Sequence, residues 1–262
     1  HAGFRYVESD NPVQLHEDPY ETDALAAQYC DAHYGPEHFG VPNFAKACAD
    51  ICLEVTSGRP RGHALDLGCA VGRSSFELAR GFDRVTGIDF SSRFFRLAAR
   101  MQEEGYLRYA LPEEGEIVSY HELSLEDLGL AALRDRVQFY QGDACNLPDK
   151  FSGYDLVLAA NILDRLYSPR RFLAGIQGRI NPGGILVLVS PYTWLEEYTK
   201  KEEWLGGYRE AGEPVWTLDA LKAELSPHFR MLGEPRDVSF VIRETRRKFQ
   251  HGISELTVWE LK

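Results

Sequence analysis

The feature that most constrains this chain is a pair of apolar segments, each ending at a small or an acidic residue. Residues 64–75 read Ala-Leu-Asp-Leu-Gly-Cys-Ala-Val-Gly-Arg-Ser-Ser, and residues 85–91 read Val-Thr-Gly-Ile-Asp-Phe-Ser. The pattern predicts two buried parallel strands with a helix between them. Gly68 ends the first strand, where a residue without Cβ lets the backbone approach a ligand. Asp89 ends the second strand, where a carboxylate can accept both hydroxyls of a ribose, so we expect a nucleoside-binding edge.

The glycine spacing distinguishes between nucleoside cofactors. A dinucleotide fingerprint requires Gly-x-Gly-x-x-Gly, because its third glycine packs the helix against the strand. Here the second and third positions are Ala70 and Arg73, and the glycines Gly68 and Gly72 lie four residues apart. The run resembles motif I of class I S-adenosylmethionine (SAM) methyltransferases, Asp-x-Gly-x-x-x-Gly. The resemblance implies SAM as the cofactor and S-adenosylhomocysteine as its product, and it disfavours an NAD-dependent enzyme.

Three further segments resemble the same class. Residues 139–148 look like the adenine-recognition segment of this class, with Asp143 as the acceptor for the exocyclic amine. Residues 154–161 look like its fourth strand, and residues 181–189 look like the turn into its fifth strand. The resemblance implies a Rossmann-like, doubly wound α/β sheet of seven strands with a C-terminal antiparallel hairpin; the same fold with another ligand is the alternative. The expected cofactor-binding residues are Gly68, Cys69, Ala70, Arg73, Asp89, Phe90, Ser91, Asp143, Ala144 and Asn161.

Patterning predicts one structural domain. An arm and helices at 1–58 cap the site, and a methyltransferase core at 59–262 carries insertions at 104–135 and 191–216. We expect residues 1–20 to form a polar arm, and we interpret 104–135, which is rich in glutamate, as a solvated insertion. The expected helices cover residues 21–34, 43–55, 72–82, 91–103, 169–180 and 217–225, with Thr217 as a cap. The expected strands cover residues 63–69, 84–90, 137–142, 156–161 and 185–190, followed by two strands within 231–262.

Charge and cysteine content restrict the partners. The net charge of −11 argues against a nucleic-acid substrate and against an anionic membrane surface. No apolar run is long enough to span a membrane, and no signal peptide is visible. The five cysteines lack metal-ligand pairing, so we expect reduced thiols, no metal centre and a cytoplasmic protein. A small-molecule substrate fits these constraints.

Candidate chemical groups follow the fourth and fifth strands. Asn161 and Asp164 lie near the expected methyl-transfer position and are the first candidate catalytic residues. Arg165 could bind a substrate carboxylate in a bidentate manner. Alternatively, Asp164 caps the helix at 169–180 or pairs with Arg170. Near its start, the following insertion carries two aromatic residues, Tyr192 and Trp194. These side chains either line the substrate site, where they could face the sulfonium, or pack in the core.

Two other regions carry candidates. His33 could accept a proton, because an unperturbed histidine has a pKa of about 6.5, and Tyr34 beside it is a candidate substrate contact; a structural histidine is the alternative. Arg243, Glu244 and Lys248 lie in a basic segment of an otherwise acidic chain. This segment either meets a negatively charged substrate group or is a solvated surface.

Longer runs resemble the 5-thiohistidine N-methyltransferases of ovothiol biosynthesis. The resemblance implies methyl transfer to the imidazole π-nitrogen of 5-thiohistidine, and a functional link or fusion to an iron-dependent sulfoxide synthase. It implies cations for the substrate carboxylate and thiolate from Arg165, Arg243 and Lys248, and an ammonium acceptor in Asp164 or Glu244. The alternatives are a SAM methyltransferase for another small thiol, amine or carboxylate metabolite, or a SAM-binding non-catalytic subunit. The runs begin at Tyr20, His33, Leu65, Gly142, Ala160, Ser190 and Arg243.

Overall fold

A mostly parallel sheet forms the centre of the protein. The structure, a computed structural model, describes residues 23–262. The sheet follows the order β10-β12-β7-β6-β1-β2-β5, with β11 paired to β12 outside that path. Five strands run parallel, and β12 runs antiparallel to β7. The parallel strands are β1 (His63–Leu67), β2 (Arg84–Asp89), β5 (Val137–Gln141), β6 (Tyr154–Ala160) and β7 (Ile180–Ser190).

The register brings the carboxyl ends of the central strands to one edge. Leu67 of β1 pairs with Ile88 of β2 on one side and with Ala159 of β6 on the other. Asp89 and Asn161, which follow these partners, therefore lie at the same edge as Gly68. Ligands of open α/β sheets bind at this edge, so the fold positions the predicted cofactor residues together.

Helices cover both faces of the sheet, as a doubly wound fold requires. Alternate strand residues face opposite sides, so Ala64 and Leu158 join one apolar core while Leu65 and Val157 join the other. The predicted fold class is confirmed. The first core packs against α1 (Asp23–Tyr34), α2 (Phe44–Val55), α3 (Arg73–Leu78) and α4 (Ser92–Glu104), and the second against α5 (Pro169–Ile176) and α6 (Thr217–Leu225).

Side-chain caps explain where several helices begin. Asn43 accepts from the Lys46 amide at 3.0 Å, and Ser91 accepts from the Phe94 amide at 3.1 Å. Both predicted helix starts are thereby confirmed. Thr217 is instead the first residue of α6, and its Oγ1 accepts from the indole of Trp194 at 3.0 Å. The third helix ends at Leu78, earlier than the predicted residue 82, because the chain turns there.

The insertion at 104–135 contains a hairpin whose first strand is packed and whose second strand is exposed or half-buried, so its interpretation as a solvated segment was wrong for the first strand. It contains β3 (Tyr106–Glu114), β4 (Ile117–Ser124) and the 3-10 helix η2 (Ala131–Arg136). Leu107, Tyr109 and Leu111 point inward and are buried, and Tyr109 donates to Asp31 of α1 at 3.0 Å. The alternation of these three side chains was the available signal, because it has the two-residue period of a half-buried strand.

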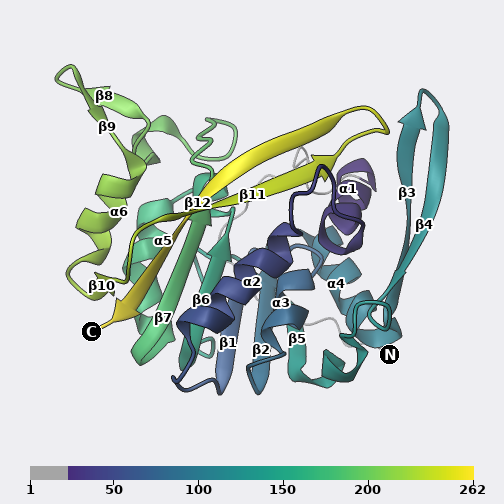
Figure 1. Cartoon of the computed structure of the whole chain (residues 1–262). Helices are drawn as coiled ribbons and strands as arrows, with labels where there is room; N and C mark the ends of the chain where they lie inside the picture. Colours follow the sequence, from purple (N-terminus) through teal and green to yellow (C-terminus); the bar gives the residue numbers. More distant parts are fainter. Residues whose placement is uncertain (1–22) are drawn as a thin grey trace.

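The C-terminal segment forms three strands rather than the predicted two. They are β10 (Phe229–Met231), β11 (Arg236–Arg243) and β12 (Phe249–Leu261). The predicted antiparallel hairpin is present as β11–β12, and β11 brings the sheet to eight strands instead of seven. Figure 1 shows this hairpin crossing the upper part of the molecule toward α1 and the tip of β3–β4. There Arg243 pairs with Glu113 at 2.5 Å.

The insertion at 191–216 contains the 3-10 helix η5 (Lys201–Glu203) and a small hairpin, β8 (Tyr208–Glu210) with β9 (Glu213–Val215). Two further 3-10 turns flank α5, namely η3 (Leu163–Arg165) and η4 (Gln177–Arg179). Within residues 23–262, no helix is both long and apolar enough to cross a membrane. The predicted arm at 1–20 lies outside the described residues.

Candidate active site

The turn after β1 requires glycine for packing within the chain itself. Gly68 and Gly72 have φ angles of 71° and 92°, which L side chains rarely adopt. A Cβ on Gly68 would lie 1.9 Å from Cγ2 of Ile162, and one on Gly72 would lie 2.6 Å from the ring of Phe139. The space beside Gly68 is therefore filled by the segment after β6. This corrects our prediction that close approach of a ligand explains the glycine.

A buried carboxylate in β1 fixes the helix that follows the turn. Asp66 accepts from the hydroxyls of Ser74 and Ser75, each at 2.6 Å. Burial raises the pKa of Asp66 to about 6, against the opposing effect of the two hydroxyls. Sequence reasoning did not select Asp66 as a site residue, although it is the first position of the motif quoted above.

Asp89 joins the ends of β1 and β2. Its Oδ2 accepts from the amide of Ala70 at 2.8 Å, and its Oδ1 accepts from the amide of Ser91 at 2.9 Å. These two bonds come from the turn after β1 and from the start of α4. The backbone thus fixes the direction of the carboxylate, and the predicted neighbours Ala70, Phe90 and Ser91 lie around it.

Asp143 occupies the corresponding position after β5. It accepts from the amide of Cys145 at 2.8 Å and from the hydroxyl of Tyr167 at 2.9 Å. Tyr167 was not a predicted site residue, and the predicted residue Ala144 lies between Asp143 and Cys145 in sequence. These bonds hold the carboxylate at the expected adenine edge, where it can still accept from an exocyclic amine.

Two predicted cofactor residues are enclosed by protein. Cys69 is buried, and burial raises the pKa of its thiol well above the ordinary value. Arg73 forms an ion pair with Glu77 at 2.7 Å and donates to the carbonyl of His33 at 3.2 Å. The guanidinium therefore ties α1 to α3, a positioning role rather than the cofactor contact we predicted.

Asn161 ends β6 with a strained backbone. Its φ is 55°, which is uncommon for a residue with a side chain and persists only where the surroundings hold it. Its amide donates to the carbonyl of Val189 at 2.8 Å, and its Oδ1 accepts from Ser254 Oγ at 2.8 Å. The Asn161 side chain is thus fixed by β12, a partner that sequence reasoning missed because it lies 93 residues further along the chain.

Asp164 is saturated with hydrogen bonds. Its Oδ2 accepts from Thr193 through both the amide (2.9 Å) and the hydroxyl (2.7 Å) and from Arg165 (2.8 Å), while Oδ1 accepts from Ser190 at 3.1 Å. It neither caps α5 nor pairs with Arg170, which bonds to Glu224. The contacts connect the ends of β6 and β7, so Asp164 positions these two segments, and its predicted catalytic role stays a prediction.

The predicted substrate residues after β6 and β7 have different surroundings. Arg165 donates to Asp164 and Thr193, and its guanidinium lies 4.8 Å from the ring centroid of Tyr198. Trp194 is buried and stacks with Trp204, so core packing accounts for it. Tyr192 has a φ of 53° and donates through its hydroxyl to Glu255 at 2.8 Å. Tyr192 thus connects the end of β7 to Glu255 of β12, a partner that was not predicted.

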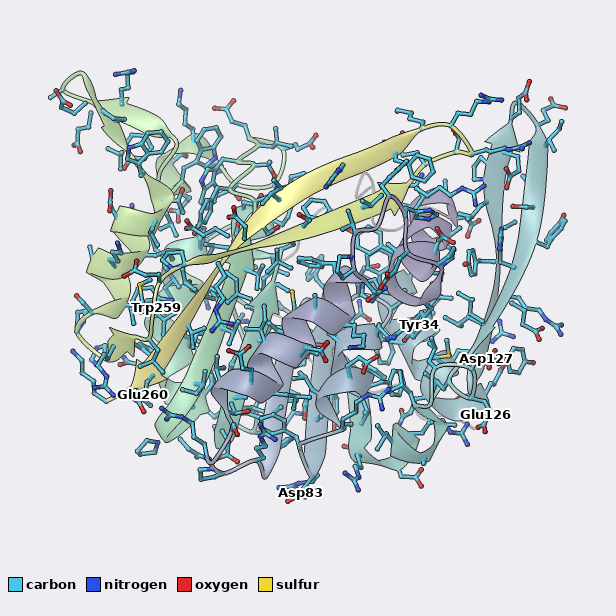
Figure 2. The ribbon with its side chains drawn as sticks, viewed as in Figure 1. Tyr34, Asp83, Glu126, Asp127, Trp259 and Glu260 are labelled. Atoms are coloured by element: carbon cyan, nitrogen blue, oxygen red, sulfur yellow. The ribbon has the colours of Figure 1, made fainter. Side chains whose placement is uncertain are left out.

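The helix α1 residues are interior rather than catalytic. Tyr34 is buried and donates to the carbonyl of Val71 at 2.7 Å, which fixes α1 to the turn after β1 (Figure 2). Burial and, to a lesser extent, the positive charge of Arg73 lower the pKa of His33 to about 3. We predicted that His33 has an ordinary pKa. In the folded protein its pKa is instead low, so the imidazole stays neutral at neutral pH.

A pH-dependent loss of stability should follow from His33. The imidazole of His33 takes up a proton near pH 6.5 in the unfolded state and only near pH 3 in the folded state. The contribution of His33 to the free energy of unfolding is therefore fully present above pH 6.5 and is progressively lost as pH falls toward 3. Between pH 7.5 and 5, the free energy of unfolding should fall by about 2 kcal/mol more in the wild type than in His33→Gln. Urea titrations at both pH values measure this. The exposed His228→Gln serves as control, and identical pH dependence in wild type and His33→Gln would contradict the assignment.

The predicted contacts at the hairpin tip lie apart from the strand edge. Arg243 pairs with Glu113, and Lys248 pairs with Glu244, which also accepts from Gln250 at 2.7 Å. Ser254 at the edge lies five positions along β12 from Phe249, the partner of Arg243. This separation is about 17 Å along a strand. The structure therefore does not bring Arg243, Glu244 and Lys248 together with Asn161.

Comparison with known proteins adds a family match. Residues 65–188 match the family model described as a methyltransferase domain. Similar solved structures include a SAM-dependent methyltransferase from Methanosarcina mazei, with 21% identity, 79% of this chain and 96% of that chain covered, and a TM-score of 0.51. The N-methyltransferase NodS from Bradyrhizobium japonicum WM9, in complex with S-adenosyl-L-homocysteine, has 14% identity, coverage of 90% and 98%, and a TM-score of 0.52. The [4+2]-cyclase SpnF has 18% identity, coverage of 92% and 96%, and a TM-score of 0.52. No curated protein matches the chain.

These findings define the class of the protein. At such identities the structural likeness shows the fold, which the chain shares with a cyclase as well as with methyltransferases. The family match covers the segment from β1 into β7 and identifies residues 65–188 as a methyltransferase domain. This match supports SAM-dependent methyltransferase chemistry for that segment, and the acidic residues Asp89 and Asp143 follow two of its parallel strands, at their carboxyl ends.

Proposed function

We propose that the chain transfers the methyl group of SAM to the imidazole π-nitrogen of 5-thiohistidine, the last step of ovothiol A biosynthesis. The observation that carries the proposal is that runs resembling the 5-thiohistidine N-methyltransferases are joined to one another by side-chain hydrogen bonds. Asp143 and Tyr167, from two of these runs, are bonded to each other, and Asp164 connects to Ser190 and Thr193 of a third. Residues far apart in sequence thus assemble at one strand edge.

The site chemistry suits transfer to a neutral nitrogen. SAM supplies an electrophilic methyl on a sulfonium, and a neutral imidazole nitrogen is already nucleophilic. The residues of the chain then need to hold that nitrogen in line at roughly 3 Å, which supplies most of the rate enhancement. A strong base is not required, which agrees with the low pKa of His33 and the saturated carboxylate of Asp164. Asn161, fixed by Ser254, is the polar side chain that we assign to the transfer position.

The acceptor identifies a preceding reaction. In this proposal, 5-thiohistidine comes from an iron-dependent sulfoxide synthase, which acts as a separate or fused partner. The likeness to NodS, an N-methyltransferase, is compatible with transfer to nitrogen.

Mass spectrometry tests the proposed reaction. The protein is incubated with SAM and either 5-thiohistidine or histidine, and NMR locates the methyl group in any product. We expect a gain of one methyl on 5-thiohistidine alone, at the π-nitrogen. A protein that binds SAM and methylates neither compound would contradict the proposal. The alternatives would then be another small thiol, amine or carboxylate acceptor, or a SAM-binding subunit without catalysis.

A further inference from the structure

We propose that Glu255 binds the ammonium group of the amino-acid acceptor and that Tyr192 positions Glu255 for this contact. The inference rests on the proposed function and deepens it by assigning the recognition of one substrate group. It starts from the register of β12. Glu255 pairs with Ser190, the last residue of β7, so it lies at the edge where the parallel strands end.

Glu255 has an oxygen available for a ligand. Its Oε1 accepts from the hydroxyl of Tyr192 at 2.8 Å. Among residues 23–262, no group donates to Oε2, and this atom is not among the buried polar atoms without a partner. Tyr192 therefore fixes one oxygen of the carboxylate, while the other oxygen is open to solvent, where it can accept a hydrogen bond from a ligand.

The charge of Glu255 is not neutralised by the described residues. Its donor, Tyr192, is uncharged, and burial together with Glu255 raises the pKa of that hydroxyl above its ordinary value. In contrast, the neighbouring carboxylate of Asp164 is paired with Arg165. A carboxylate held only by a neutral hydroxyl favours a cationic partner, because charge-assisted hydrogen bonds are the stronger ones. An ammonium group supplies such a cation with three donors.

The residue before Glu255 fixes the predicted methyl-transfer position, from the opposite side of β12. Ser254, the adjacent residue, donates to Asn161 at the predicted methyl-transfer position. In 5-thiohistidine the π-nitrogen is the ring nitrogen closer to the amino group, only a few covalent bonds away. An acceptor held by its ammonium group at Glu255 therefore keeps the π-nitrogen closer to this edge of the sheet than the τ-nitrogen.

The backbone at this point is built to hold the contact. Asn161 and Tyr192 both have left-handed φ angles, 55° and 53°, at the ends of β6 and β7. Such angles persist where other bonds hold them, and β12 supplies one bond to each side chain, through Ser254 and Glu255. One strand thus fixes both the transfer position and the proposed ammonium acceptor.

The experiment compares 5-thiohistidine with its analogue lacking the amino group, using wild type, Glu255→Gln and Glu260→Gln. Glu260 is a matched control because it lies on the same strand at the far end, as Figure 2 shows. With 5-thiohistidine, we expect Glu255→Gln to raise KM about 30-fold, with kcat changed less and the Kd for SAM unchanged, since a charge-assisted bond is lost. With the analogue, Glu255→Gln and wild type should have equal kcat/KM. A loss that is equal for both acceptors, or no loss, would overturn the inference.

Calorimetric binding of both acceptors in the presence of S-adenosylhomocysteine separates this inference from the proposed reaction. Binding that depends on Glu255 only for the compound with an amino group, without methylation, would overturn the reaction and keep the inference. Methylation with Glu255-independent binding would overturn the inference alone. Tyr192→Phe tests positioning, and it should raise KM for 5-thiohistidine about fivefold with little change for the analogue.

Discussion

Replacing Asp164 with alanine should lower the free energy of unfolding by about 3 kcal/mol, because it leaves buried donors without their acceptor. The groups affected are the amide and hydroxyl of Thr193, the hydroxyl of Ser190 and one contact of the Arg165 guanidinium. Urea unfolding monitored by circular dichroism measures the change. We expect Asp164→Asn to lose a similar amount, since an amide places a donor where the carboxylate accepts.

Asp149→Ala is the control for Asp164, because that carboxylate is fully exposed and loses the same charge. We expect it to unfold within about 0.5 kcal/mol of wild type. If Asp164→Asn kept wild-type stability while kcat fell more than a thousandfold, Asp164 would be a catalytic base after all. The stability measurement therefore distinguishes a positioning residue from a catalytic one.

Asp89→Ala should weaken SAM binding about 100-fold. We expect the carboxylate to accept both ribose hydroxyls, and the loss of two charge-assisted hydrogen bonds costs about 3 kcal/mol. Isothermal titration calorimetry with SAM and with S-adenosylhomocysteine measures the affinity. Because Asp89 also accepts from the amides of Ala70 and Ser91, thermal unfolding should accompany the titration to establish that the variant is folded.

The matched control for Asp89 is Asp83→Ala. Asp83 is exposed and precedes β2 at the opposite end of the sheet, as Figure 2 shows, so the same charge is removed far from the edge. Its affinity for SAM should stay within twofold of wild type. An Asp89→Ala variant that is folded and binds SAM as the wild type does would refute the ribose contact.

The parts of the fold that depend on local sequence were predicted. Asn43 and Ser91 begin helices because their side chains accept from amides three residues later. The ends of β1 and β2 were also predicted from local sequence. Each apolar run stops there, at Gly68 because glycine permits the turn and at Asp89 because a charged side chain ends the apolar run. The hairpin at 106–124 was missed although its alternation is local, because the acidic residues around it were given more weight.

The parts of the site that depend on distant residues were not predictable in the same way. His33 has an ordinary sequence context, and only the packing of α1 beside Arg73 lowers its pKa. Asp164 was expected near the methyl group, but its saturation depends on Thr193, 29 residues later. Glu255 has no local signal, because its partner Tyr192 lies 63 residues earlier in the chain. The cofactor edge is encoded locally, whereas the acceptor edge is assembled by tertiary pairing.

The pairing of β12 with β7 has a consequence for how acceptor specificity can change. Because side chains alternate along a strand, Ser254 and Glu255 face opposite sides of the sheet. A slip of one residue in this ladder would exchange their sides, together with those of the core residues Leu256 to Trp259. The buried residues of β12, among them Ser254, therefore enforce the alignment of Glu255 with the end of β7. If Glu255 contacts the acceptor as proposed, we expect substitutions at this position to change which acceptor is bound while the register of β12 stays unaltered.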